Sequence, residues 1–146
     1  MKFFSAVTLF GAVGSCLKGG TLYMTAPATD IPSFKKFLVE LAGAIKDPYT
    51  KRRPYLVLDN HSAHRSAQVR EHLERFHAIF QPAYSSPFNC QETVWAQLKH
   101  EYYARLHRRD SDLANEVEFR NMVLQLCEDV PVNAATILRA NRRYVA

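Results

Sequence analysis

The sequence contains little cysteine, and its three cysteines are scattered. Cys16, Cys90 and Cys127 form no C-x-x-C pair. A disulfide framework or a zinc site is therefore not expected. A reducing, intracellular compartment is the simpler interpretation, which would be nuclear in a eukaryote and cytoplasmic in a bacterium.

Several motifs and any long hydrophobic run are also missing. There is no G-x-x-x-x-G-K, no G-x-G-x-x-G and no G-x-S-x-G, so nucleotide-binding and serine-hydrolase functions have no support. No apolar run is long enough for a transmembrane helix, and no membrane partner is expected. The 146 residues show no repeats and no low-complexity segment, and they correspond to one domain.

Positive charge gathers in the middle of the chain. The formal net charge is +5, and residues 51–109 carry ten basic and five acidic side chains. Residues 1–50 have a net charge of +2, and residues 110–146 have one of −2. The basic segment holds Asp59 and Glu92, and such a surround suits a polyanionic substrate. Exposed lysine and arginine can equally form a solvated surface.

The first sixteen residues permit two interpretations. MKFFSAVTLFGAVGSC has a basic start, an apolar run and a small-residue end, which is typical of a secretory or lipoprotein signal. It is also typical of a buried strand over residues 3–13, followed by a turn at Gly19-Gly20 and a second strand over residues 21–25. Composition alone does not separate the two.

The rest of the pattern predicts alternating helices and strands. A helix capped by Asp30 or Ser33 is expected to run to about Lys46, because apolar residues recur on one face of it. Further strands are expected at residues 55–58 and 78–80, further helices at residues 64–75, 89–107 and 111–129, and a loosely held tail from Asn133. This order indicates an α/β fold with a mixed sheet.

Two carboxylates stand where an α/β sheet places its site. Asp59 follows a continuous apolar strand, and Glu92 lies in the first turn of a helix that begins near Asn89. Two converging carboxylates can hold Mg²⁺ or Mn²⁺, which activate a water or a 3′-hydroxyl for phosphodiester cleavage. Each also has a structural alternative. Asp59-Asn60 is a common turn signal, and Asn89 with Glu92 is close to a capping box worth about 1 kcal/mol.

Two separated blocks resemble the catalytic domain of mariner-type DDE transposases. The first is Leu58-Asp59-Asn60 followed by His64, and the second is QPAYSSPFNCQETVWAQLK. The family pattern is close to LDN-x-x-x-H and P-x-YSP-x-LNPIE-x-x-W-x-x-LK. The spacing from Tyr84 to Glu92 fits without a gap. The departures from the pattern include Ser86, Cys90 and Gln91, where the family usually has Pro, Pro and Ile.

The resemblance implies a ribonuclease H-like, three-layer α/β/α fold with a mixed sheet, and it favours the strand interpretation of the N-terminus. It implies that Asp59 and Glu92 are catalytic ligands of a two-metal site, with Asn60, His64 and Asn89 in supporting roles. Lys99 and Arg105 would then reach DNA phosphates from the exposed side of the helix.

The resembled family needs a third acid on a first, central strand, and no residue here matches it. The acids before Asp59 lie in or beside the first predicted helix, and they are Asp30, Glu40 and Asp47. Residues 1–130 are therefore expected to be an N-terminally truncated catalytic domain, and residues 131–146 a basic C-terminal tail.

The expected function is that of a DDE-type transposase or endonuclease, which cleaves DNA and transfers strands with Mg²⁺ or Mn²⁺. Alone it would be inactive, and a homo-oligomer or a missing N-terminal part would have to complete it. The first alternative is a non-catalytic nucleic-acid-binding or interaction module derived from a transposase. The second is a secreted or lipid-anchored domain.

Overall fold

Short strands and longer helices alternate along the chain. The computed structural model describes residues 7–46, 52–85, 89–107 and 116–142. In order, these residues form β1 (Thr8–Val13), β2 (Thr21–Ala26), α1 (Ile31–Gly43), β3 (Tyr55–Leu58), the 3-10 turns η1 (Ser62–Arg65) and η2 (Ala67–Val69), α2 (Arg70–Leu73), β4 (His77–Phe80), α3 (Cys90–His107), α4 (Glu116–Asp129) and α5 (Ala134–Arg142). The fold is α/β, as the sequence predicts.

The strands form two separate pairs. β1 and β2 are antiparallel, with Thr8 opposite Ala26, and β3 and β4 are parallel, with Tyr55 opposite His77. The pairing is therefore mixed, as expected, but it is divided between two two-stranded sheets. No strand among the described residues joins the two pairs.

One apolar cluster packs α1 and the 62–76 segment against one face of all four strands. Its buried members include Phe10 of β1, Leu58 of β3, Phe34 and Leu38 of α1, and Val69. The α1 helix begins as predicted, because the Asp30 carboxylate accepts a hydrogen bond from the Ser33 amide at 2.9 Å. Its last residue is Gly43, three positions before the predicted end.

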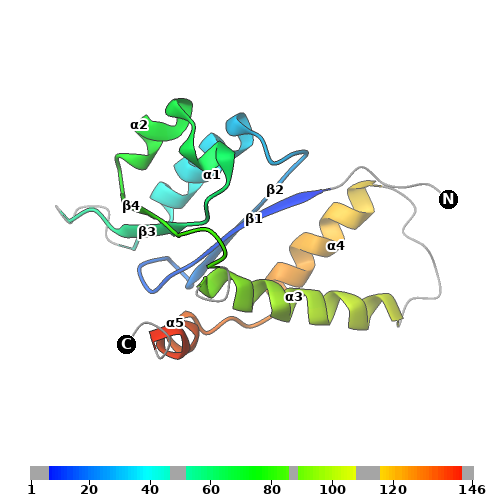
Figure 1. Ribbon diagram of the computed structural model, residues 1–146. Coiled ribbons are helices and arrows are strands. Elements are labelled where there is room, and N and C mark those ends of the chain that lie inside the picture. The colour runs from blue at the N-terminus through cyan, green and yellow to red at the C-terminus, as the bar shows by residue number, and fades with distance from the viewer. Residues whose placement is uncertain (1–6, 47–51, 86–88, 108–115, 143–146) are drawn as a thin grey trace.

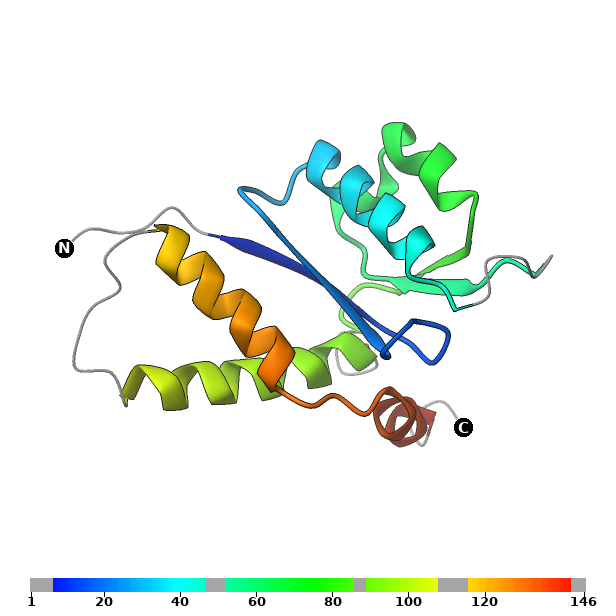
Figure 2. The same ribbon diagram turned by 180° about the vertical axis from the view of Figure 1, so that it is seen from behind.

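A second apolar cluster lies on the other face of the β1–β2 hairpin. Val94 and Leu98 of α3, Leu126 and Cys127 of α4, and Ile137 of α5 are buried there. Alternation along the strands produces this arrangement, because neighbouring side chains point to opposite faces. Figures 1 and 2 show the resulting layers, with α1 and α2 on one side of the hairpin and α3, α4 and α5 on the other.

The expectation of a loosely held tail after Asn133 is wrong for the described residues. The Asn133 side chain accepts a hydrogen bond from the Thr136 amide at 3.0 Å, and α5 follows. Ala134 and Ile137 are buried, because a three-residue step places both on the face that meets the second cluster.

The helix predicted over residues 64–75 is also broken. Ser66 adopts an extended backbone (φ −60°, ψ 140°), and its hydroxyl accepts a hydrogen bond from the Gln68 amide at 3.2 Å. The segment is therefore two 3-10 turns followed by α2. The first residues of the predicted strand 3–13 and the predicted cap Ser111 lie outside the described residues. No helix in the described part of the chain has the length and apolar character needed to cross a membrane.

Candidate active site

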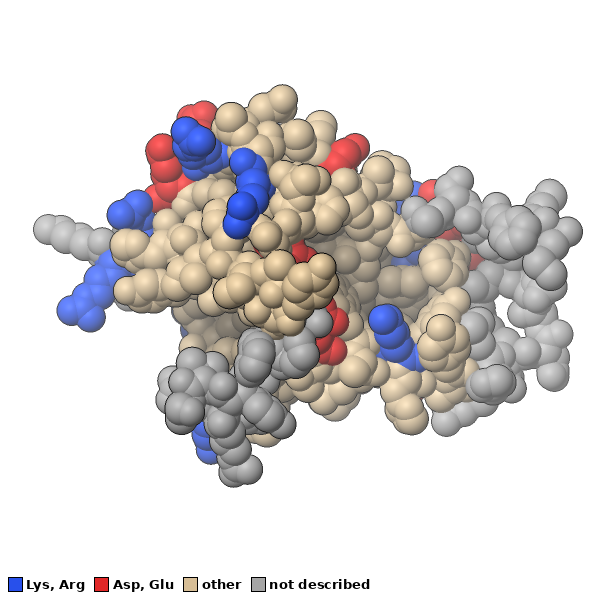
Figure 3. Space-filling view, viewed as in Figure 1, with Lys and Arg blue, Asp and Glu red and all other residues tan. Residues whose placement is uncertain are grey.

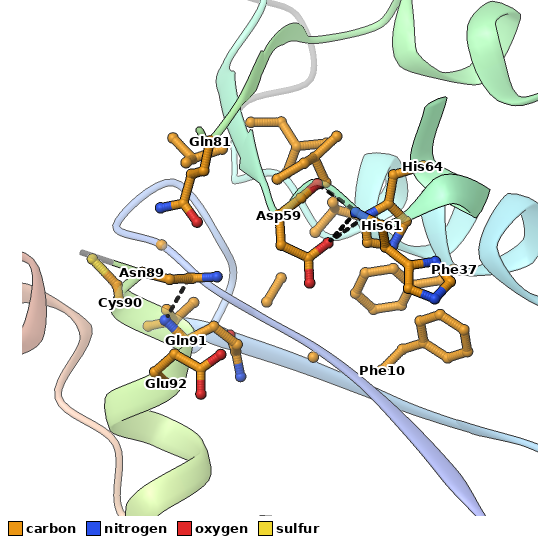
Figure 4. A pocket seen from close by; sticks show the side chains of 18 of the residues that line it. Phe10, Phe37, Asp59, His61, His64, Gln81, Asn89, Cys90, Gln91 and Glu92 are labelled. Atoms are coloured by element: carbon orange, nitrogen blue, oxygen red, sulfur yellow. Dashed lines mark hydrogen bonds and ion pairs between the residues drawn. The ribbon is translucent and has the colours of Figure 1, made fainter. Parts of the chain in front are cut away.

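A cavity of about 490 Å³ lies between the two sheets. Its walls are β1, β3, α1 and the first turns of α3, and much of the lining is apolar. The polar side chains in the lining include those of Asp59, His61, His64, Gln81, Asn89, Gln91 and Glu92 (Figure 4). The cavity therefore brings together segments that are far apart in the sequence.

Asp59 reaches the cavity because β3 ends one residue before it. Leu58 is buried in the first cluster, so the alternation of the strand turns Asp59 away from that cluster. Asp59 Oδ1 accepts a hydrogen bond from the His61 amide at 3.3 Å, so the residue also makes the turn that the Asp-Asn pair predicts. In Figure 4 the second carboxylate oxygen of Asp59 is turned into the cavity.

His64 holds the Asp59 carboxylate in place. His64 Nδ1 lies 2.7 Å from Asp59 Oδ1, and its side chain is 13 % exposed against 60 % for Asp59. Burial lowers the pKa of His64 below its usual value, and this outweighs the opposing effect of the Asp59 carboxylate. The ring is therefore neutral at pH 7. With the proton on Nδ1, the neutral ring donates a hydrogen bond to the Asp59 carboxylate.

Glu92 faces the cavity from the first turn of α3, and Asn89 caps that helix without it. The Asn89 side chain accepts a hydrogen bond from the Gln91 amide at 3.0 Å. Among the described residues, the Glu92 carboxylate has neither a hydrogen-bond nor an ion-pair partner. The reciprocal half of a capping box is thus missing from this helix. Asp59 and Glu92 enter the cavity from separate elements (Figure 4).

The site offers oxygen atoms of the kind that a hard divalent cation prefers, but it offers too few of them. Carboxylate oxygens are the preferred ligands of Mg²⁺ and Mn²⁺. Within the described ranges, no group of three His, Cys, Asp or Glu side chains is placed to hold a metal ion. By themselves, Asp59 and Glu92 would supply only part of the ligand set of such an ion.

The other predicted site residues lie outside the cavity. Asn60 and Lys99 are exposed, and neither lines the cavity. Arg105 joins α3 to α4, because its guanidinium lies 3.0 Å from Glu101 and 2.9 Å from Asp129. Its hydrogen bonds to these two carboxylates raise its pKa. Contacts of Lys99 and Arg105 with DNA stay predictions.

Charge on this face of the molecule is unevenly distributed. Figure 3 shows acidic side chains in the hollow at the middle of the face. Basic side chains lie, together with acidic ones, over the part of the molecule that holds α2 and β3. This arrangement agrees with the excess of basic residues in the 51–109 segment.

Gln91 is a cavity residue that the sequence analysis did not assign to the site. Both polar atoms of its side-chain amide are buried and have no hydrogen-bond partner among the described residues. Its Nε2 would lie 2.9 Å from a Cβ atom placed on Gly11 of β1. The sequence does mark this residue, because Gln91 stands where the resembled family usually has Ile.

Comparison with known proteins places these elements in a family context. A family model described as DDE superfamily endonuclease matches residues 6–114. The match includes β1 to α3 and therefore both carboxylates that face the cavity. The α/β architecture is consistent with a ribonuclease H-like domain of this kind. No curated protein and no solved structure matches the chain.

Proposed function

Because the chain belongs to the DDE superfamily endonuclease family, we propose that it is a transposase-like nuclease domain whose metal ligands are Asp59 and Glu92. One observation carries the assignment. Two carboxylates from separate elements line one cavity, and Glu92 has no structural partner among the described residues. A carboxylate without a structural role at the first turn of a helix is available as a ligand.

The chain's own residues would prepare the site before any ion arrives. His64 holds one oxygen of Asp59 and leaves the other facing the cavity. Asn89 starts α3 and thereby sets the position of Glu92. Divalent ions held by Asp59 and Glu92 would activate a water or a 3′-hydroxyl and would stabilise the leaving oxygen. Lys99, further along α3, is the residue that we propose to contact the DNA backbone.

More specifically, we propose that the domain is of the mariner type and that its catalytic site needs a third acid to be complete. The LDN-x-x-x-H block and the Tyr84 to Lys99 block support the mariner type. Asp59 and Glu92 are two acids where the resembled site needs three, so we expect little cleavage by this chain alone. A non-catalytic nucleic-acid-binding module derived from such a domain is the second candidate, and the absence of a three-residue metal cluster among the described residues favours it.

The proposed function can be tested on the chain by itself. Binding to a short DNA duplex should weaken steadily as salt rises, because phosphate contacts release counterions. Supercoiled plasmid should stay intact in Mg²⁺ or Mn²⁺. The wild-type chain could instead nick the plasmid, with nicking abolished by Asp59→Ala and by Glu92→Ala but not by Glu71→Gln on α2. That result would support the metal site and disprove the need for a third acid. An absence of DNA binding at low salt would contradict both candidate functions.

A further inference from the structure

The β3–β4 pair is covered on one face and open on the other. Its even-numbered side chains pack in the first apolar cluster, on the side where α1 and α2 lie (Figures 1 and 2). Its odd-numbered side chains point the opposite way. On this open face Tyr55 is 74 % exposed, Val57 is 53 % exposed and Ile79 is 47 % exposed. Contiguous apolar groups that stay in water mark an interaction surface.

The open face carries a stacked aromatic pair. Tyr55 lies opposite His77 in the parallel register, and Val57 lies opposite Ile79 in the same way. The ring centroids of Tyr55 and His77 are 5.0 Å apart, and the two rings are inclined by 31°. Both residues are exposed. Their rings are therefore available to a flat, unpaired base, because stacking on an aromatic side chain accepts every base.

Arginine side chains adjoin this aromatic pair. Arg53 Nη1 donates a hydrogen bond to the Glu74 carbonyl at 3.0 Å, which holds the guanidinium near the start of β4. A carbonyl is neutral, and neither Arg53 nor the exposed Arg75 has an ion-pair partner in the part of the chain that the structure describes. Across residues 52–80, arginines outnumber acids by five to three. Positive charge beside exposed rings suits a strand with an anionic backbone.

The open face leads to Asp59. Strand alternation places Asp59 on the same side of β3 as Tyr55 and Val57, and all three residues line the cavity. Four residues of extended chain span about 13 Å. A few nucleotides cover that distance, and the Asp59 side chain is 60 % exposed. A strand whose base is stacked on Tyr55 can therefore reach the Asp59 carboxylate.

We propose that the open face of the β3–β4 pair binds unpaired nucleotides of a DNA strand. One base stacks on Tyr55 and His77, and the neighbouring phosphates lie near Arg53 and Arg75. Bases within a duplex stack on one another and present only their edges, so this surface selects a single strand over a duplex. The delivery of that strand to Asp59 rests on the proposed function, whereas its binding does not.

A pair of substitutions at Tyr55 tests the stacking. Fluorescence anisotropy of a labelled oligothymidylate of about twelve nucleotides, measured in EDTA, reports binding without a metal. Tyr55→Leu removes the ring and keeps an apolar side chain, so it should weaken binding at least about fivefold. Tyr55→Phe keeps the ring and should bind like the wild type. No binding by the wild type, or an equal affinity of the two variants, would overturn the proposal.

Two further measurements support that comparison. Thermal unfolding should be the same in both variants, because Tyr55 is exposed. An oligothymidylate with one central 5-iodouracil crosslinks on irradiation to an aromatic side chain that stacks on this base. We expect mass spectrometry to find the adduct at Tyr55 or His77. Adducts confined to Tyr103, an exposed aromatic residue on α3, would overturn the proposal.

A protein partner is the competing occupant of an apolar face. Sedimentation would detect it as a dimer of the wild type that Val57→Ser converts to a monomer. That result, together with no binding of the oligothymidylate, would identify a contact between copies of the chain and overturn the proposal.

Duplex DNA separates this inference from the proposed function. Tyr55→Leu should leave the affinity for a duplex of the same length unchanged, and an equal loss for duplex and single strand would overturn the selection of unpaired nucleotides. Single-strand binding that depends on Tyr55, in a chain that binds neither duplex nor Mn²⁺, would support the stacking surface and count against the proposed function. Binding of duplex and Mn²⁺, with single-strand binding that is indifferent to Tyr55, would do the reverse.

Discussion

His64 Nδ1 lies 2.7 Å from Asp59 Oδ1, and the His64 ring packs on Phe34 with 4.2 Å between the ring centroids. These two contacts connect the acid at the end of β3 to the apolar cluster under α1. The position of Asp59 therefore depends on core packing as well as on its own turn.

Replacing His64 tests this connection. His64→Ala removes the donor to Asp59 and the contact with Phe34, and we expect a loss of about 1–2 kcal/mol in the free energy of unfolding. Urea denaturation measures this loss. His100→Ala, at an exposed position on α3, should change the same quantity by less than about 0.5 kcal/mol. Equal effects of the two substitutions would show that His64 has no special structural role.

Gly11 controls the distance between β1 and α3. A Cβ atom there would lie 2.6 Å from Trp95 Cη2, whereas one on Gly43 would have nothing within 4 Å. Gly11→Ala should destabilise the protein by about 1–3 kcal/mol through overpacking. Gly43→Ala should be neutral or stabilising by up to about 1 kcal/mol. Thermal unfolding compares them, and recovery of stability in Gly11→Ala with Trp95→Phe would identify the ring as the cause.

Tyr23 should limit stability at high pH. Burial raises its pKa to about 12, and the negative charge of the Cys127 thiolate adds to the effect. Because the folded-state pKa is above the ordinary value of 10.0, the contribution to stability is complete below pH 10 and is lost as pH rises toward 12. Tyr23→Phe should therefore lose less thermal stability than the wild type across this range.

The exposed Tyr103 provides the control for that experiment. Tyr103→Phe should follow the wild-type curve, because its side chain is already largely in solvent. Burial raises the pKa of Cys127 from 9.0 to about 11, so its contribution is lost over a lower, overlapping pH range, and it remains in both variants. Coincident curves for Tyr23→Phe and Tyr103→Phe would contradict the assignment.

Local chemistry made several features predictable from the sequence. The Asp30 cap, the apolar face of α1 and the strand before Asp59 each depend on neighbouring residues, and the structure confirms them. Features that depend on distant packing were harder to predict. The burial of Ile137 needs the second cluster. The division into two sheets arises from the arrangement of whole strands.

The candidate site shows the same contrast. The turn at Asp59 and the start of α3 at Asn89 follow from short motifs. The burial of the Gln91 amide follows from the approach of α3 to Gly11, which no local pattern encodes. The pairing of Arg105 with Asp129 likewise depends on where α4 packs.

Manganese binding to the isolated chain is the most direct test of a site shared by Asp59 and Glu92. Calorimetric titration with millimolar MnCl₂ would compare the wild type with Asp59→Ala, Glu92→Ala and the control Glu71→Gln. We predict binding heat in the wild type and the control, and its loss in each of the other two variants. Binding that survives either alanine substitution, or is absent from the wild type, would contradict a shared metal site.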